Sequence, residues 1–328
     1  MNFFLTATPA NGLQLQPGEC ALPYPTTTNQ SRPPLGETMN ITKDTFPLDR
    51  IPDIQKTPEN FRLLLRLESF TGRLCPRVGD EKPLLILDLE TTGFNRSDKI
   101  IEFGFVRCSY SPSEKKLTSV DGVASLYNDP GCDISDFITG LTGIKTGDVK
   151  GQHVTRNDLD TWTFGAPLVV AHNAGFDCPF FYEFDSTLPM MNWVCSAEDI
   201  DWKSMGMSSK CLEYLCFKHG FFYEAHRASI DCMAVCRLLQ LNQPAFEQLL
   251  DKSEWEWSTI FARDSPFSSK DTLKARGYNW IGGVWQKNIA RHDVEAEKKF
   301  LGELYPAGGQ LAQVRDIHKS VRYRKRKR

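Results

Sequence analysis

The pattern of apolar and polar positions divides the chain into two regularly patterned parts between two polar ends. Residues 1–58 are rich in Pro, Thr, Asn and Gln and show no sustained apolar period, which predicts a disordered or loosely attached extension. Residues 83–242 alternate apolar runs with amphipathic segments, and residues 255–306 show the same kind of alternation on a smaller scale. Residues 307–328 follow as a tail in which six of the last seven residues are basic.

A short segment, residues 59–82, connects the extension to the first patterned part. Within it, at residues 61–67, charged positions fall between apolar ones at about helical spacing. We therefore expect a helical lead-in, with a short amphipathic helix that lies against the following domain.

The first patterned part is typical of an α/β domain. Residues 84–89 form a continuous apolar run, as expected of a strand that is buried on both faces. Further strands are expected at 100–106, 117–127, 168–171 and 192–195, and helices at 155–164 (with Thr155 as N-cap), from 174 onward, at 209–219 and at 228–241. Because strands come first and then alternate with helices, the pattern predicts an α/β fold with a mixed sheet.

The second patterned part predicts a small α/β module. Ser265-Pro266 favours the start of a helix and Gly277 its end, because Ser caps, Pro fits the first helical position and Gly stops a helix. Gly282-Gly283 between short apolar runs indicates a hairpin. A strand is expected at 257–262 and an amphipathic helix at 293–304.

Composition and charge fit a globular chain and at first disfavour nucleic acid as a partner. The 328 residues are 41% hydrophobic and 24% charged, with a formal net charge of −2. Along the chain, however, residues 81–235 carry a net −9 and residues 236–328 a net +7. An acidic middle beside a basic end is a pattern that needs an explanation.

Targeting and redox signals indicate a cytoplasmic protein. No stretch approaches the ~20 apolar residues of a membrane span, and the start of the chain lacks a signal peptide. The ten cysteines form no CxxC motif and mostly lie in apolar runs. This pattern favours reduced, buried thiols over a disulfide scaffold or a structural zinc site.

Asp88 and Glu90 are the first candidate site residues. They lie two positions apart at the end of the run 84–89, so an extended chain places both side chains on one face. Buried carboxylates need a cation, and no Lys or Arg is adjacent in sequence, which makes a divalent metal ion a candidate partner. The alternative is a strand that ends in solvent. The glycine turn at 91–93 favours the metal, because backbone N–H groups there can approach a ligand closely.

Two further acidic residues lie near the starts of predicted helices. Asp177 lies one turn into a helix, and Asp231 lies in the first turn of the helix 228–241, with His226 in the loop just before it. Taken alone, each acid is explained by the helix dipole, and the histidine by an ordinary surface position. Together with the first pair they make four carboxylates from three segments, which can converge at one edge of the sheet.

Four carboxylates at one point favour a particular chemistry. Hard oxygen ligands suit Mg²⁺ or Mn²⁺ rather than zinc. Two such ions ~3.5–4 Å apart clamp the attacking and leaving oxygens of an in-line phosphoryl displacement. A histidine of ordinary pKa ~6.5 can take a proton from the attacking water. The residues thus favour an in-line phosphoryl displacement by water.

Three motifs, in order along the first patterned part, give the chain a resemblance to a known family. They are Asp88-Leu89-Glu90-Thr91-Thr92-Gly93, His172-Asn173-x-x-Phe176-Asp177 and His226-Arg227-Ala228-x-x-Asp231. They resemble the motifs of the DEDDh-type 3′–5′ exonuclease superfamily, which includes the proofreading epsilon subunit of bacterial DNA polymerase III, ribonuclease T and oligoribonuclease. The resemblance implies a ribonuclease-H-like fold, with a mixed five-stranded sheet flanked by helices.

The resemblance also implies residue roles. His226 would be the general base. Two Mg²⁺ or Mn²⁺ ions would be held by Asp88, Glu90, Asp177 and Asp231. Substrate-binding positions would be Thr91, Thr92, Gly93, Phe94, Leu141, Thr142, His172 and Asn173.

The implied function is a metal-dependent 3′–5′ exonuclease that releases nucleoside 5′-monophosphates from single-stranded DNA 3′ ends, in replication proofreading or repair. Two alternatives stay open: an RNA-trimming exonuclease similar to ribonuclease T, and a non-catalytic nucleic-acid-binding protein. Association with a polymerase or replisome is also left open, and no membrane partner is expected.

The second patterned part resembles a small module appended to some bacterial exonucleases of the superfamily. Its basic and aromatic residues would suit phosphate contacts and base stacking, although the aromatics are also needed to fill a small core. These residues are Lys270, Lys274, Arg276, Tyr278, Trp280 and Trp285. The basic tail is either a solvated end or a nonspecific attraction for the strand.

Overall fold

The computed structural model describes residues 48–95 and 97–324. The chain separates into two compact units, Met1–Arg62 and Leu63–Arg328. The expected extension therefore lies outside the described residues over 1–47, as do the last four residues of the basic tail.

The described end of the extension is helical. Residues 48–60 hold α1 (Ile51–Lys56) between two single-turn 3-10 helices. The expectation of disorder is wrong for this stretch. Pro52 explains part of the difference, because it lies in the first turn of α1, where its fixed φ favours a helix start.

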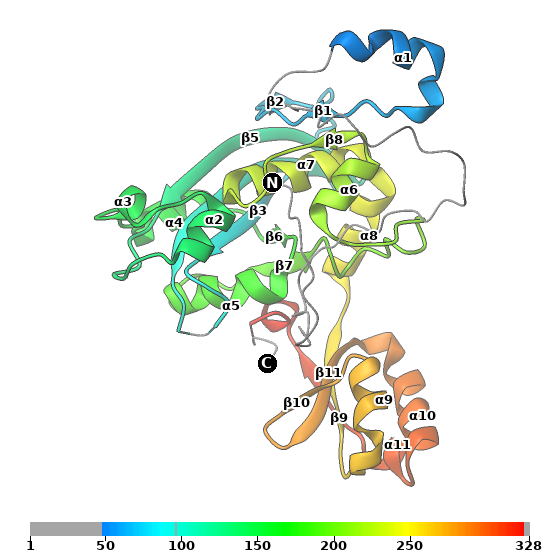
Figure 1. Cartoon of the computed structure of the whole chain (residues 1–328). Coiled ribbons are helices and arrows are strands. Elements are labelled where there is room, and N and C mark those ends of the chain that lie inside the picture. Colours follow the sequence, from blue (N-terminus) through cyan, green and yellow to red (C-terminus); the bar gives the residue numbers. More distant parts are fainter. Residues whose placement is uncertain (1–47, 96, 325–328) are drawn as a thin grey trace, which may run out of the picture. The chain divides into compact units, whose positions relative to one another are not determined.

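Six strands of the second unit form one mixed sheet (Figure 1). Its strands are β2 (Gly72–Arg73), β3 (Lys82–Thr91), β4 (Ile100–Ser111), β5 (Lys116–Tyr127), β6 (Leu168–Ala171) and β7 (Asn192–Cys195). They are ordered β2-β5-β4-β3-β6-β7. The central strand β3 pairs antiparallel with β4 and parallel with β6. The α/β class and all five expected strands are confirmed, and β2 adds a sixth strand at the edge.

Helices cover both faces of this sheet, because β3 is apolar on both sides. Leu84 and Ile86 belong to one core cluster with residues of α7 (Ala228–Leu241). Leu85 belongs to a second cluster with residues of α5 (Ala174–Phe184). The remaining helices of this part are α2 (Asp136–Thr142), α3 (Thr146–Val149), α4 (Arg156–Thr163), α6 (Leu212–Lys218) and α8 (Gln243–Glu254).

Local sequence signals account for several of these boundaries. The Oγ1 of Thr155 accepts a hydrogen bond from the N–H of Asp158 at 3.2 Å, which confirms the expected N-cap of α4. The bounds of α7, β6 and β7 are those expected from the sequence. The sequence did not predict α2, α3 or α8.

The lead-in at residues 59–82 is not a helix. Instead it runs as an extended chain in which β1 (Leu65–Arg66) pairs parallel with β8 (Phe221–Phe222). The N–H of Leu67 donates to the carbonyl of Phe222 at 2.8 Å. Pairing with β8 satisfies the backbone groups of the segment, and this tertiary contact overrides the weak helical preference of the residues.

The second patterned part folds as a four-stranded antiparallel sheet with helices against it. Its sheet order is β10-β11-β9-β12. In chain order the elements are β9 (Trp257–Ala262), α9 (Lys270–Ala275), β10 (Asn279–Ile281), β11 (Val284–Ala290), α10 (Val294–Leu304), α11 (Gly308–Leu311) and β12 (Gln313–Ile317). Because β12 completes this sheet, the expected boundary at 306 is wrong, and the module extends at least to Ile317.

Turn signals in this module are mostly confirmed. Gly282 and Gly283 have φ values of +60° and +80°, as the two-residue hairpin between β10 and β11 requires. Ser265 is not the cap of a helix: Pro266 is extended, and α9 begins only at Lys270 after a 3-10 turn. Gly277, with φ of +89°, follows the end of α9 as expected.

The described part of the basic tail is folded against the part of the same unit that holds the six-stranded sheet. Arg322 donates to both carboxylate oxygens of Asp199, at 2.5 and 3.0 Å, and the Tyr323 hydroxyl donates to the same carboxylate. Tyr323 is 8% exposed and joins the core cluster of α5. The expectation of a solvated tail is therefore wrong for these residues, because a buried carboxylate needs a cation.

Two further findings concern the described residues as a set. None of their helices has the length and apolar character needed to span a membrane. The nine cysteines among them are free, and most are buried.

Candidate active site

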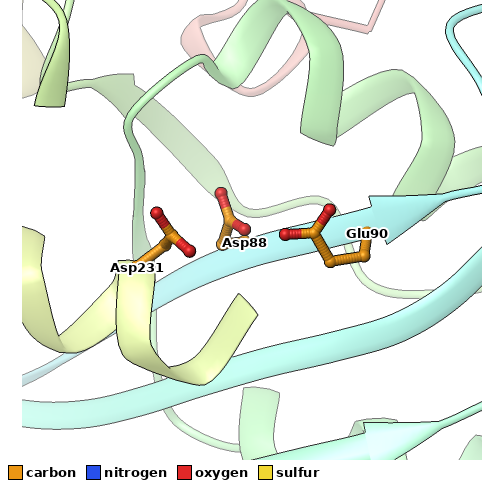
Figure 2. A group of neighbouring side chains, drawn as sticks. All are labelled: Asp88, Glu90 and Asp231. Atoms are coloured by element: carbon orange, nitrogen blue, oxygen red, sulfur yellow. The ribbon is translucent and has the colours of Figure 1, made fainter. Parts of the chain in front are cut away.

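The carboxylates of Asp88, Glu90 and Asp231 lie together beside β3. The side chains at 84, 86, 88 and 90 share the face of β3 that packs against α7. This face is apolar at the start of the strand and acidic at its end. Figure 2 shows Asp88 and Glu90 on β3, with Asp231 facing them from the first turn of α7. One oxygen from each lies within 4.8 Å of the others.

These carboxylates oppose one another's ionisation. Burial raises the pKa of Asp88 well above its ordinary value, and the charges of Asp177 and Asp231 raise it further. Burial and the charge of Asp231 raise the pKa of Glu90. Like charges held together out of water are unstable without a cation. The site therefore has both the ligand atoms and the electrostatic need for a divalent ion.

Asp177 lies in the first turn of α5 and is 2% exposed. Burial raises the pKa of Asp177, while hydrogen bonding to the backbone N–H of Leu89 lowers it. The charge of Asp177 in turn raises the pKa of Asp88. Asp177 is thus electrostatically linked to the cluster, although within the described chain it lies outside the group that meets within 4.8 Å.

His226 lies in the loop between β8 and α7, with an exposed side chain and a φ of +67°. This left-handed conformation is uncommon for a residue other than glycine and is held by the surrounding structure. Partial burial of the ring lowers the pKa of His226 below its ordinary value. The neutral imidazole, which can accept a proton, is therefore the form present at neutral pH.

Hydrogen bonds to Asp231 shape this loop. The backbone N–H of Arg227 donates to one carboxylate oxygen at 3.0 Å, and the hydroxyl of Tyr223 donates to the other at 3.1 Å. Backbone hydrogen bonding from His226 also lowers the pKa of Asp231 against the effect of burial. The cluster acid and the candidate base therefore belong to one hydrogen-bonded unit.

Glu102 is a buried acid that the sequence analysis missed. It is 0% exposed and lies directly opposite Glu90 in the β3–β4 register. Its carboxylate accepts hydrogen bonds from the N–H of Ala228 at 3.2 Å, from Arg227 at 3.5 Å and from Ser125 at 2.5 Å. Glu102 thus fixes the start of α7 to the sheet. A charged residue inside an apolar strand was the signal that could have revealed it.

Gly104 lets α7 approach β4 closely at the same point. A Cβ at this position would lie 2.1 Å from the carbonyl carbon of Ala228, so no other residue fits without moving the helix. The guanidinium of Arg227 also donates to the Tyr127 hydroxyl at 2.7 Å. Together these contacts set where α7 begins, and hence where Asp231 lies.

The turn after β3 is held by its own side chains. Thr91 donates to the carbonyl of Gly93 at 2.6 Å, and Thr92 donates to Asp98 at 3.3 Å. A Cβ on Gly93 would lie 2.7 Å from an Asp98 oxygen, so a larger residue here would displace the Asp98 carboxylate. The turn is thus preformed beside Glu90.

Phe94 and Leu141 differ from Thr142 in what they offer a ligand. Phe94 is 68% exposed, and its ring centroid lies 6.2 Å from that of Phe176, so its face is available for a base. Leu141 is partly buried at the end of α2. Thr142 is 3% exposed, and its hydroxyl bonds Ile138 and Ile144 within the same helix end. Thr142 thus supports the local backbone.

His172 and Asn173 follow β6. The ring nitrogens of His172 bond the Ser196 hydroxyl at 2.9 Å and the Lys210 carbonyl at 2.8 Å. Burial lowers the pKa of His172 to about 4, so the ring is neutral and ties two loops together. Asn173 is exposed at the start of α5 and makes no side-chain cap bond there.

Comparison with known proteins identifies a family for most of this part of the chain. The exonuclease family RNase_T matches residues 85–239. This stretch includes all five residues of the DEDDh pattern that the sequence analysis named. No curated protein sequence matches the chain.

Several solved structures are similar to about half of the chain. A 3′-exonuclease described in 3′-end specific recognition of histone mRNA stem-loop is 17% identical, covers 54% of this chain and 86% of its own, and has a TM-score of 0.40. The nuclease domain of 3′hExo, a DEDDh family member bound to rAMP, is 19% identical, covers 54% and 96%, and has a TM-score of 0.42. Exonuclease X in complex with 5′ overhanging duplex DNA is 20% identical, covers 52% and 99%, and has a TM-score of 0.35.

Proposed function

Residues 85–239 belong to the DEDDh exonuclease superfamily, and from this premise we propose that the protein is a metal-dependent 3′–5′ exonuclease. Its proposed substrates are 3′ ends of single-stranded DNA, and its products are nucleoside 5′-monophosphates, in proofreading or repair. The observation that carries the proposal is the group formed by Asp88, Glu90 and Asp231, whose oxygens lie within 4.8 Å of one another.

The donor set fits divalent metal ions. It consists of carboxylate oxygens, the ligands that Mg²⁺ and Mn²⁺ prefer. In this proposal Asp88, Glu90 and Asp231 hold the ions, with Asp177 beside them. When bound, two such ions supply Lewis-acid stabilisation of the charge that develops on the phosphodiester.

In the proposal, side chains of the protein supply the general base and bind the substrate. In the proposal, His226 accepts the proton of the attacking water, since it is neutral at neutral pH and precedes the helix that carries Asp231. The exposed ring of Phe94 stacks on the terminal base, and Asn173 orients the strand. The preformed turn at 91–93 seats the terminal nucleotide.

The test is a product assay on 5′-labelled oligonucleotides with Mg²⁺. We expect stepwise shortening from the 3′ end, complete loss of activity with EDTA, and loss of activity in Asp88→Ala and Asp231→Asn. Activity that survives in purified Asp88→Ala would contradict the proposal. Binding without hydrolysis at saturating Mn²⁺ would favour the non-catalytic alternative.

The same assay on single-stranded DNA and RNA of matched sequence, as two parallel arms, tests whether the protein prefers DNA or RNA. We propose DNA, so faster cleavage of the DNA arm is expected. Faster cleavage of the RNA arm would assign the protein to RNA trimming instead.

We also propose a cytoplasmic location, because the nine described cysteines are free.

A further inference from the structure

The small module presents one covered and one open face. Directly paired residues of antiparallel strands share a face, and successive residues along a strand point to opposite faces. Ile260 and Ala262 of β9 pack with Leu273 of α9 and Leu301 of α10, so this face is covered by helices. The opposite face, which we call the open face, carries Phe261 and the residues paired with it.

Amides and arginines surround Phe261 on the open face. Gln286 of β11 and Gln313 of β12 lie directly opposite Phe261 on its two sides. The guanidinium carbons of Arg263 and Arg315 lie 5.8 and 5.5 Å from the ring centroid. Phe261 is partly exposed, and both arginines are exposed. The result is an aromatic ring between two cations.

The charge on the module is divided between the two faces. The acidic residue of β12, Asp316, is paired with Ser258 and accepts its hydroxyl at 2.7 Å, on the helix-covered side. On that side too, Arg276 bonds the buried carboxylate of Glu297. Within the described strands of the module, the open face carries arginine, amide, threonine and apolar side chains and no carboxylate.

The described end of the chain contacts part of the open face. The guanidinium of Arg322 lies 3.3 Å from the ring centroid of Trp257, at the start of β9. The Arg322 carbonyl accepts a hydrogen bond at 3.0 Å from Asn288, which pairs with Thr259 in the middle of β9. Phe261 lies near the other end of β9, and Arg263 and Arg315 beside it are exposed.

We propose that the open face binds single-stranded nucleic acid, with Arg263 and Arg315 contacting phosphates and Phe261 stacking on a base. This inference rests on the proposed function, because the face would hold the strand whose 3′ end is cleaved. A ring flanked by cations and amides matches the alternation of base and phosphate in a single strand. Amide side chains also hydrogen-bond base edges.

The test measures binding of a fluorescein-labelled single strand of about 20 nucleotides to the full chain in EDTA, by fluorescence anisotropy. The face variant is Arg263→Gln/Arg315→Gln. The matched control is Lys298→Gln/Lys299→Gln, which removes the same charge from neighbouring positions on α10, the helix that packs on the covered face of the module. Oligo-dT and oligo-rU form separate arms.

For the face variant we expect about tenfold or weaker binding at low salt, and a slope of log Kd against log salt that is smaller by about two. The control should bind within about twofold of the unaltered chain, because the loss of two charges away from the bound strand has little effect. Loss confined to one arm would assign the face to DNA or to RNA.

Equal binding by the face variant and the control would overturn the proposal. Phe261→Leu provides a second reading, because it keeps an apolar side chain and removes only the ring. We expect weaker binding of this variant with an unchanged salt slope, and unchanged binding would contradict stacking. Since no metal is present, these measurements do not depend on hydrolysis: a chain without nuclease activity would refute the proposed function and leave the binding face testable.

Discussion

The carboxylates of the candidate active site repel one another when they are ionised. The sheet and helices hold them together despite this repulsion, which lowers the stability of the folded chain. Asp88 and Glu90 are fixed by β3, and Asp231 is fixed by the start of α7. None of them can move away without disturbing a core strand or a core helix. A divalent cation relieves the repulsion, so metal binding and stability are expected to be linked.

Without metal, stability should fall as pH rises. The pKa is raised to about 7 for Asp231, to about 8 for Asp177 and to about 9 for Glu90. Unfolded carboxyls titrate near pH ~4, so between these values the folded chain holds more protons than the unfolded chain. Urea unfolding in EDTA should therefore show a decreasing free energy of unfolding from about pH 4 to pH 9.

Saturating Mg²⁺ should restore stability at the alkaline end of this range, because the folded chain alone holds the carboxylates together. Asp88→Asn is the matched variant, since it removes one charge at nearly constant shape. It should flatten the pH dependence and weaken the effect of Mg²⁺. Stability in EDTA that does not change with pH would contradict the repulsive cluster.

Replacement of His226 should separate catalysis from metal binding. We expect His226→Gln to lower kcat by about 10²–10⁴-fold, since it removes the proposed general base. Stabilisation by Mg²⁺, measured by thermal unfolding, should persist, because the carboxylates remain. Loss of that stabilisation would mean that His226 acts on the metal site.

At the scale of elements, the start of α7 decides the geometry of the site. Its position depends on Glu102 and Gly104 of β4, which contact the backbone of Ala228. Strand β4 thus fixes the start of α7, and the start of α7 fixes the position of Asp231. Neither β4 residue belongs to a recognised motif. Such contacts join positions more than a hundred residues apart in sequence.

Gly104→Ala tests this placement. The added Cβ would lie 2.1 Å from the Ala228 carbonyl carbon, so α7 must shift. We expect a loss of stability of about 1–3 kcal/mol in urea unfolding and a fall in nuclease activity larger than the stability loss explains. Gly140→Ala on α2 is the control: nothing lies within 4 Å of its Cβ, and it should be neutral or stabilising.

Elements whose pattern is internal to the segment were predicted well. The run 84–89 is a central strand because its residues are apolar on both faces, and Thr155 caps α4 because its oxygen reaches an N–H three residues on. The segment 61–67 was predicted wrongly. Its conformation depends on pairing with β8, which lies far along the chain.

At the scale of the whole second unit, the end of the chain holds two folded parts together. Arg322 and Asp199 form an ion pair whose side chains are 11% and 1% exposed. Arg322 belongs to the tail, and Asp199 follows β7 of the nuclease part. A pair of this kind, once broken on one side, leaves a buried charge without a partner.

Arg322→Ala should therefore destabilise the unit by about 3–5 kcal/mol in urea unfolding. Arg291→Ala is the matched control. Its ion pair with Glu256 has side chains that are 57% and 73% exposed, so we expect a loss below about 1 kcal/mol. If both variants lose the same small amount, the tail does not anchor the module.

The sequence by itself determined the fold class and the five main strands, and it named the acids and the histidine of the candidate site. These follow from periods of two and 3.6 residues and from motifs that are local in sequence. The tertiary structure decided what brings Asp88, Glu90 and Asp231 within 4.8 Å, and it revealed the support from Glu102. It also decided where the module ends, because β12 and Arg322 are recognisable only by their partners. Contacts between distant segments depend on how the elements pack, and no local pattern records them.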